Sequence, residues 1–246
     1  MQCVVLAGGL GTRLGARTRD VPKAMVGVAG EPFVQRQLAL LADQGFSRVI
    51  LCIGHLGSQI RDFVGDGGRF GLVVEYADEG EELRGTGGAL RLAFDAGLLE
   101  NRFAVLYGDS YLPIDVTPVW EAATRDSRPA LMTVYRDPGG REHPNVEYQD
   151  GSVILYQKGQ PTDQMHHVDY GLSVVTRAVI DRDVPAGVAT DLAELFHGLS
   201  TRDLLAGFEV VERFYEIGSP AGLADLEAYL AGPIHAPTLD PPRSSD

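Results

Sequence analysis

Apolar runs of strand length alternate with amphipathic stretches through the first half of the chain. The apolar runs predict strands over residues 2–7, 48–53, 72–76 and 103–107. Helices are predicted between them over residues 32–44, 59–64 and 88–96; the first has the amphipathic sequence PFVQRQLALLA and ends before Gly45. Regular alternation of strand and helix is typical of an α/β fold. We therefore expect a Rossmann-like, mostly parallel sheet with helices on both faces.

The hydrophobic pattern changes after Asp109. Predicted strands now alternate with Gly, Pro and Asp turns, over residues 130–135, 145–148, 153–156, 168–176 and 208–217. Helices are predicted over residues 117–123, 190–199, 200–206 and 220–230, with Thr117 and Thr190 as caps of the first two. This half is expected to form a small mixed β lobe.

These patterns predict one domain over residues 1–231, made of a first half, 1–112, and a second half, 113–231. Residues 232–246 contain four prolines and no hydrophobic periodicity, so we expect a disordered tail there.

Composition narrows the class of protein. At 246 residues and 44% hydrophobic content, the chain is long enough for one α/β domain with a full core. It has no run of eighteen apolar residues, and no basic region precedes the apolar start, so we expect neither a membrane span nor a signal peptide, and a cytoplasmic location. Cys3 and Cys52 fall in predicted strands and are expected to be buried thiols. The net charge of −13 disfavours nucleic acid as a partner.

A glycine-rich turn follows the first predicted strand, in the sequence VVLAGGLGTRL of residues 4–14. Gly8, Gly9 and Gly11 allow the backbone to approach an anion closely, and their successive N–H groups can form a concave set of donors. Arg13 and, nine residues past Leu14, Lys23 add two positive charges. This combination predicts a phosphate-binding site in a protein that is otherwise strongly acidic.

Other types of site fit the sequence poorly. The turn is not followed by GK[ST], as a Walker A loop requires, and Leu14 stands where a dinucleotide fingerprint has its third glycine. The second strand ends at Ile53-Gly54-His55 without an acidic residue for a ribose, which disfavours nicotinamide cofactors. The six histidines form no i, i+4 pair and no GxSxG motif occurs, so neither a zinc site nor a serine nucleophile is expected.

The segment GGLGTRL together with Pro22-Lys23 resembles the signature of the sugar-1-phosphate nucleotidylyltransferases. The segment YADE…GTGGALR and the short chain look most like heptose- or mannose-1-phosphate guanylyltransferases, with muramate-type uridylyltransferases and cytidylyltransferases close behind. The resemblance spans roughly residues 2–230. It implies transfer of a nucleoside monophosphate from an NTP to a sugar 1-phosphate, with pyrophosphate as the second product.

The resemblance also implies roles for individual residues. Arg13, Lys23 and Asp109 would be catalytic, and Asp109, which follows Gly108 at the end of a strand, would hold Mg²⁺. Glu216, in FYEIGSP, stands where the family usually has an Asp and is the second metal ligand expected. The nucleotide would contact Leu6, Ala7, Gly8, Gly9, Gly11, Thr12, Glu79, Gly85, Thr86, Gly87, Gly88 and Asp109.

The base is inferred from one side chain. The family has an acidic or amide residue that pairs with the base about seven residues before the GTGG turn, and Glu79 matches it with one extra residue, Arg84, in the intervening loop. A carboxylate only accepts hydrogen bonds, which suits the N1–H and N2–H donors of guanine and favours GTP. Glu81 or Glu82 could equally be this residue, and a UTP- or CTP-dependent enzyme remains the alternative.

The acceptor side matches the family more loosely. The residues expected there are Asn145, Lys158, Asp169, Tyr170, Gly171 and Asp191. Lys158 would pair with the sugar phosphate, Asp169 replaces a family asparagine, and Asp191 is the nearest substitute for the usual sugar-binding glutamate. These replacements leave open which sugar is accepted. The replacements at Glu216 and Asp169 also leave open a non-catalytic nucleotide-sugar sensor on the same fold, and the sequence does not fix whether the chain forms a homo-oligomer.

Overall fold

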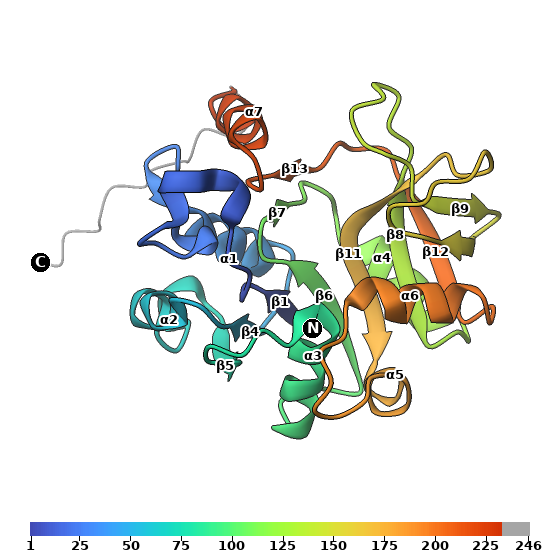
Figure 1. Cartoon of the computed structure of the whole chain (residues 1–246), viewed down its shortest axis with the longest axis horizontal. Helices are drawn as coiled ribbons and strands as arrows, with labels where there is room; N and C mark the ends of the chain where they lie inside the picture. The colour runs from blue at the N-terminus through green and yellow to red at the C-terminus, as the bar shows by residue number, and fades with distance from the viewer. Residues whose placement is uncertain (233–246) are drawn as a thin grey trace, which may run out of the picture.

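The computed structural model describes residues 1–232, and its centre is a nine-stranded sheet (Figure 1). The strand order is β5-β4-β1-β6-β11-β8-β12-β10-β9. The first half of the chain supplies four neighbouring strands, β1 (Gln2–Leu6), β4 (Arg48–Ile53), β5 (Val73–Asp78) and β6 (Arg102–Tyr107). All three pairings among these strands are parallel, with Val5 of β1 opposite Leu51 of β4 and Leu106 of β6. The predicted parallel α/β core is confirmed.

Helices cover both faces of this sheet, as expected for strands that are apolar on both sides. One face carries α1 (Phe33–Asp43), α2 (Gly57–Val64) and α4 (Thr117–Arg125), which bury Leu38, Ile60 and Val119 against it. The opposite face carries α3 (Gly85–Asp95), α5 (Arg177–Asp183) and α6 (Leu192–Ser200). Two apolar cores therefore sandwich the sheet. Among residues 1–232, no helix combines the length and the apolar character needed to cross a membrane.

The mixed β region of the second half extends the same sheet. Its strands are β8 (Ala130–Tyr135), β9 (Val146–Gln149), β10 (Ser152–Tyr156), β11 (Val168–Thr176) and β12 (Leu205–Val210). β11 runs antiparallel to both β6 and β8, and β12 is parallel to β8. β11 thus joins the parallel half directly to the mixed half (Figure 1).

The end of the described chain returns to its beginning. Helix α7 (Pro220–Leu230) packs Leu223 and Leu226 into a third apolar cluster with Leu14 and Phe33 (Figure 1). The short strand β13 (Tyr215–Glu216) pairs with β7 (Ser110–Tyr111), which directly follows Asp109. This return brings the FYEIGSP segment beside Gly108-Asp109, which we call the GD motif.

Short elements complete the first half. They are the 3₁₀ helices η1 (Thr12–Thr18), η2 (Lys23–Met25) and η3 (Gly68–Phe70) and the two-stranded pair β2 (Gly27–Val28) and β3 (Glu31–Pro32).

Several predicted elements differ from the structure. The helix predicted over residues 200–206 is wrong, because the chain turns at Asp203 (φ +55°) and enters β12, where Leu205 and Ala206 are buried beside β8. The strand predicted over residues 208–217 is two strands, β12 and β13. Helix α5 was not predicted. The tail predicted over residues 232–246 lies, beyond Gly232, outside the described residues.

The starts of α3 and α6 and the cap of α4 also differ from the prediction. Helix α3 begins at Gly85 rather than Gly88 because the Thr190 carbonyl accepts the N–H groups of Gly87 and Gly88. Helix α6 is capped by Asp191 instead of Thr190, through a bond from the Ala193 N–H to Oδ1. The Thr117 side chain makes no capping bond, and Oδ1 of Asp115 accepts the Thr117 N–H instead. In each case the group that satisfies the helix start is one that local sequence did not single out.

Gly108 gives a direct test of this packing. A Cβ atom at Gly108 would lie 2.5 Å from the Leu6 carbonyl oxygen and 2.8 Å from Ala7 Cα, so β1 leaves it no space. We expect Gly108→Ala to lower the free energy of unfolding by about 2 kcal/mol or more, measured by urea denaturation. Gly27→Ala, at a position with nothing within 4 Å of the added carbon, is the control and should change stability by less than about 0.5 kcal/mol. Equal stability of the two variants would show that Gly108 is not sterically constrained.

Candidate active site

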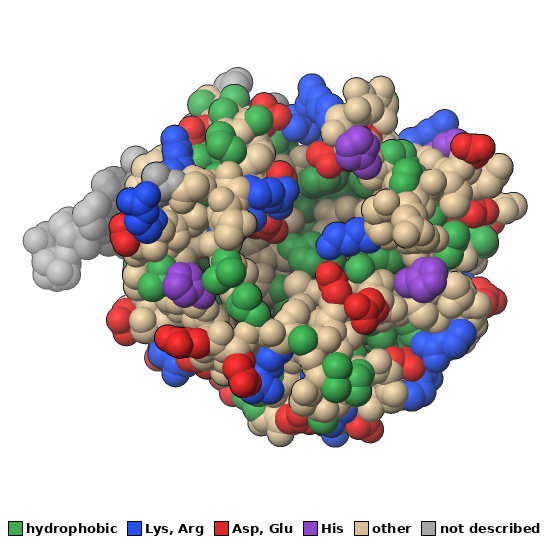
Figure 2. All heavy atoms as spheres, in the orientation of Figure 1, with side chains coloured by type: hydrophobic (Ala, Val, Ile, Leu, Met, Phe, Trp, Pro, Cys, Tyr) green, Lys and Arg blue, Asp and Glu red, His purple; other side chains and the backbone are tan. Residues whose placement is uncertain are grey.

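A cleft of about 440 Å³ opens at the carboxyl ends of β1 and β6. This is the edge of an α/β sheet at which ligands bind, and the volume lies in the range of small-ligand pockets. Figure 2 shows the face on which the molecule is hollowed between its two halves, with hydrophobic side chains inside the hollow and charged ones around it.

Most of the predicted nucleotide-binding residues line this cleft. They are Leu6, Ala7, Gly8, Gly9, Gly11, Thr12, Glu79, Gly85, Thr86 and Asp109, together with the predicted catalytic Lys23. Gly87 and Gly88 do not line it, since they are buried and their N–H groups are bonded to Thr190. Leu10, Ala24, Cys52, Leu83, Ala89, Tyr107 and Gly108 also line the cleft and were not predicted as contacts. The single signal for Tyr107 was its place immediately before the GD motif.

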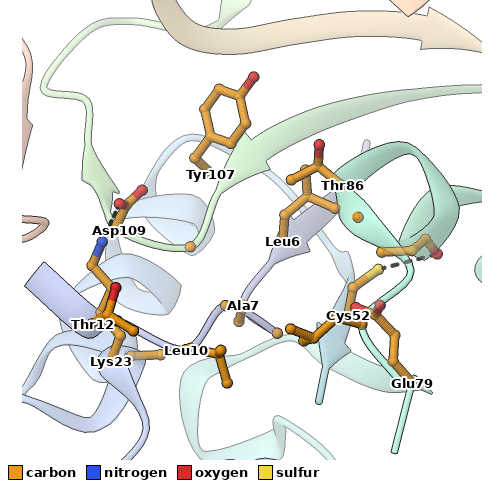
Figure 3. A pocket seen from close by; sticks show the side chains of 18 residues that line it. Leu6, Ala7, Leu10, Thr12, Lys23, Cys52, Glu79, Thr86, Tyr107 and Asp109 are labelled. Carbon is orange, nitrogen blue, oxygen red and sulfur yellow. Dashed lines mark hydrogen bonds and ion pairs between the residues drawn. The ribbon is translucent and has the colours of Figure 1, made fainter. Parts of the chain in front are cut away.

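At one end of the cleft, Lys23 and Asp109 form an ion pair. Lys23 begins η2, directly after Pro22, and its Nζ lies 2.5 Å from Oδ2 of Asp109 (Figure 3). Both side chains are largely shielded from solvent, with exposed fractions of 14% and 24%. A cation and a hard oxygen ligand are therefore held together where the glycine turn passes.

At the other end, Glu79 enters the cleft over Gly8. A Cβ atom at Gly8 would lie 2.7 Å from Oε1 of Glu79, so the carboxylate, seen at the edge of the cleft in Figure 3, lies directly against the glycine turn. Oε2 accepts the Arg84 N–H at 2.9 Å. Burial raises the pKa of Glu79, and the bond from Arg84 acts in the opposite direction. One oxygen is thus anchored, which leaves Oε1 facing the cleft.

The two alternatives to Glu79 lie elsewhere. Glu81 and Glu82 are exposed, neither lines the cleft, and Glu82 pairs with Arg84 at 3.3 Å. Of the three acidic candidates, Glu79 is the one positioned to contact a ligand in this cleft.

Glu216 approaches the same edge through the β7–β13 pair. It lies opposite Ser110, and the next residue, Ile217, donates its N–H to the Asp109 carbonyl at 2.9 Å. Gly218 then leaves space for two side chains, because a Cβ atom there would lie 2.7 Å from Oε2 of Glu216 and 2.8 Å from Nη2 of Arg13. Arg13 does not line the cleft itself but points to the region of Glu216.

The donor set suits Mg²⁺ that is shared with a phosphate. Within the described part of the chain, no group of three or more His, Cys, Asp or Glu side chains could hold a metal ion alone. Mg²⁺ commonly takes one or two carboxylates and completes its octahedral shell with substrate phosphate oxygens and water. Asp109 and Glu216 are the two predicted metal ligands, and the pairing of β7 with β13 brings their backbones to the same edge of the sheet.

Part of the predicted acceptor group gathers around Tyr107. Asn145 accepts the Asp169 N–H at 2.9 Å, Asp169 accepts the Gly171 N–H at 2.9 Å, and the Tyr107 hydroxyl donates to Asp169 at 3.4 Å. Tyr170 does not join this group, because its side chain is buried in the core against Tyr135 and Phe214. Strand alternation places Tyr170 on the opposite face of the sheet from Asp169.

Lys158 and Asp191 form a second part of the acceptor group. Nζ of Lys158 lies 3.6 Å from Oδ2 of Asp191. Burial alone would raise the pKa of Asp191, but the Ala193 N–H and the Lys158 charge lower it below its ordinary value. Asp191 therefore stays ionised beside the lysine.

Comparison with known proteins identifies relatives of the chain. Residues 3–166 match the profile of a family described as a MobA-like NTP transferase domain. The chain is 33% identical to the D-glycero-alpha-D-manno-heptose 1-phosphate guanylyltransferase of Aneurinibacillus thermoaerophilus, with 92% of this chain and 93% of that protein covered. It is 32% identical to the N-acetylmuramate alpha-1-phosphate uridylyltransferase of Neisseria meningitidis serogroup B, with 94% and 99% covered. The crystal structure of HddC from Yersinia pseudotuberculosis matches with a TM-score of 0.79 at 26% identity, over 93% of this chain and 99% of that one.

Other relatives are longer proteins. The chain spans about half the length of two of them, 53% of the UTP–glucose-1-phosphate uridylyltransferase of Synechocystis and 52% of the mannose-1-phosphate guanylyltransferase of Mycobacterium tuberculosis. The names of these proteins cover guanylyl and uridylyl transfer alike. The shared fold alone therefore does not select the base.

Asp169 gives the acceptor region a measurable pH dependence. Burial raises the pKa of Asp169 from its ordinary value of 3.8 to about 6, against the opposing bonds from Gly171 and Tyr107. The folded state therefore keeps this proton longer than the unfolded state, and the wild type loses stability as pH rises from about 4 to about 6. Asp169→Asn does not titrate and serves as the reference. Measured by urea denaturation, the free energy of unfolding of the wild type should fall by about 1–3 kcal/mol relative to that variant over this window, with no further change at higher pH. A constant difference between the two proteins from pH 4 to pH 7 would contradict the raised pKa.

Proposed function

Because the chain belongs to the MobA-like NTP transferase family, we propose that it transfers a nucleoside monophosphate from an NTP to a sugar 1-phosphate and releases pyrophosphate. The family match confirms the resemblance predicted from GGLGTRL and Pro22-Lys23. One observation carries the proposal: a single cleft has the Lys23–Asp109 pair at one end, Glu79 at the other and a glycine turn between them. That arrangement suits a ligand with a phosphate chain and a hydrogen-bonding base.

The proposed reaction needs no general base. An oxygen of the sugar phosphate attacks the α-phosphorus of the NTP, a new P–O bond forms, and the bond to the β-phosphate oxygen breaks. Pyrophosphate leaves with the electron pair of that bond. A phosphate monoester has a second pKa of about 6, so the nucleophile is already ionised at neutral pH. Catalysis then depends on positioning the two phosphates and stabilising their charge.

The chain's own groups can supply both. The N–H groups of the Gly8–Thr12 turn would hold the phosphate chain, and Lys23 would contact the phosphate that reacts. Arg13, from its place above Gly218, would reach the leaving phosphates. Lys158 would hold the phosphate of the acceptor, with Asn145 and Asp169 near its sugar.

Mg²⁺ fits this proposal as the cofactor. Asp109 and Glu216 would hold it, and when bound it would offset the negative charge of the phosphates. Lys23 already neutralises Asp109 in the free protein. On binding of a metal and a polyanion, Asp109 and Lys23 would therefore exchange each other for new charge partners. No uncompensated carboxylate would be exposed.

We propose GTP as the favoured nucleotide. Oε1 of Glu79 faces the cleft while Oε2 is held by Arg84, so the carboxylate can accept the donors of a guanine edge. The guanylyltransferase relative from A. thermoaerophilus supports this choice, whereas the uridylyltransferase relative supports the alternative. A reaction on soluble metabolites also fits the expected cytoplasmic location. Light scattering would measure whether the chain forms a homo-oligomer.

A pyrophosphate-release assay tests the reaction. We expect release when Mg²⁺, GTP and a sugar 1-phosphate from a panel of hexose, heptose and amino-sugar phosphates are all present, and none when any one is omitted. Asp109→Asn should lower kcat by about 100-fold or more and be only partly restored by excess Mg²⁺, because both a metal ligand and the partner of Lys23 are lost. Asp115→Ala, a carboxylate at the start of α4, is the matched control and should retain normal turnover.

Two outcomes would contradict the assignment. Unchanged metal dependence in Asp109→Asn would remove Asp109 from the metal site. Nucleotide binding without turnover across the whole panel would favour the non-catalytic sensor.

The base preference rests on Glu79. A neutral amide can pair with either base, and an unpaired donor in a buried pocket costs about 1–3 kcal/mol. We therefore expect Glu79→Gln to lower kcat/KM for GTP by about 10- to 100-fold and to narrow its advantage over UTP, in an assay where the two nucleotides compete. Glu82→Gln, outside the cleft, is the control. A wild type that prefers UTP or CTP, or a GTP:UTP ratio that does not change in Glu79→Gln, would mean that Glu79 does not select guanine.

A further inference from the structure

The start of helix α3 is held by a segment from the second half of the chain. The Thr190 carbonyl accepts the N–H groups of Gly87 at 2.8 Å and Gly88 at 3.2 Å, and the Thr190 N–H donates to the Arg84 carbonyl at 2.9 Å. Free N–H groups at a helix start normally find partners in a nearby side chain, water or a ligand. Here a distant backbone carbonyl replaces them, next to Gly85 and Thr86, which line the cleft.

The glycines of the GTGG turn fit this contact. A Cβ atom at Gly85 would lie 2.5 Å from the Thr190 carbonyl oxygen, and one at Gly87 would lie 3.1 Å from it. Gly85 also has a left-handed backbone, with φ +72°. A larger residue at Gly85 would push the GTGG turn away from the segment of Thr190. The shape of the GTGG turn therefore depends on residues 190–192.

Thr86 completes the connection with its side chain. Its hydroxyl accepts the Leu192 N–H at 2.8 Å and donates to Oδ1 of Asp191 at 3.1 Å, across 105 positions of sequence. Both bonds are directed at the second half. The single donor of the Thr86 hydroxyl is therefore committed to Asp191 and not to a ligand in the cleft.

Asp191 is the point at which the two halves of the site meet. Oδ1 accepts from Thr86 and from the Ala193 N–H, and Oδ2 lies 3.6 Å from Nζ of Lys158. One carboxylate thus contacts the nucleotide turn through Thr86 and the acceptor region through Lys158.

We infer that Asp191 is a positioning residue for the nucleotide, which it affects through Thr86 and the GTGG turn rather than by contact. The inference rests on the proposed function, because it takes the cleft to be the nucleotide site. A role in contacting the acceptor alone makes a different prediction, namely that loss of Asp191 leaves nucleotide binding unaffected.

Calorimetric titration with GTP and Mg²⁺ in the absence of acceptor separates these roles. Asp191→Ala should weaken nucleotide binding by about 3- to 10-fold, the effect of losing one bond that fixes the turn. Asp191→Asn keeps one carbonyl oxygen, which can accept from both Thr86 and Ala193 as Oδ1 does, so it should bind within about twofold of wild type while raising KM for the acceptor through the lost charge beside Lys158. Asp115→Ala, which removes a carboxylate from the start of α4, should bind like wild type.

A double substitution checks the route through Thr86. Thr86→Val removes the hydroxyl, so adding Asp191→Ala to it should weaken nucleotide binding by less than twofold more, since the two changes break the same bond. Nucleotide binding by Asp191→Ala equal to wild type, or fully additive effects in the double variant, would overturn the inference. Failure of the wild type itself to bind any nucleotide would instead overturn the proposed function.

Discussion

The parallel pairing of β1 with β4 on one side and β6 on the other determines where this protein can bind a ligand. Three strands that run in the same direction end at one edge, so the chain leaving each strand must turn there. Gly108 directly follows β6 and lies so close to Leu6 and Ala7, at the end of β1, that a Cβ atom has no space there. Because of this register, the glycine turn, the GD motif and the loop of Glu79 share one cleft.

Charge is distributed in the way that such a cleft requires. A chain of net charge −13 repels a polyphosphate at long range, so attraction has to come from groups close to it. Lys23 is held in place by Asp109, and Arg13 lies over Gly218 near Glu216. The ion pair with Asp109 keeps Lys23 ordered beside the glycine turn. The same carboxylates are the hard oxygen ligands that a metal would use.

The parallel half could be predicted from sequence because its signals are local. Apolar runs, the amphipathic α1 and the glycine turn each lie within a few residues of the structure that they specify.

Features that depend on distant contacts were less predictable. The start of α3 is set by Thr190, residues 205–206 form a strand because β8 lies beside them, and Tyr170 points into the core because of strand alternation. Glu79 differs from Glu81 and Glu82 in that it lines the cleft, which depends on the three-dimensional path of its loop and not on local sequence. Tyr107 was missed because nothing in its local sequence predicts that it reaches Asp169.

A crystal structure of the chain with Mg²⁺ and a non-hydrolysable GTP analogue would show directly whether this cleft is the nucleotide site. We expect the base against Glu79 and the Gly85–Thr86 turn, the triphosphate along Gly8–Thr12 beside Lys23, and the metal held by Asp109 next to the phosphates. A nucleotide bound outside this cleft, or bound with its phosphates at Glu79 and its base at Lys23, would contradict it.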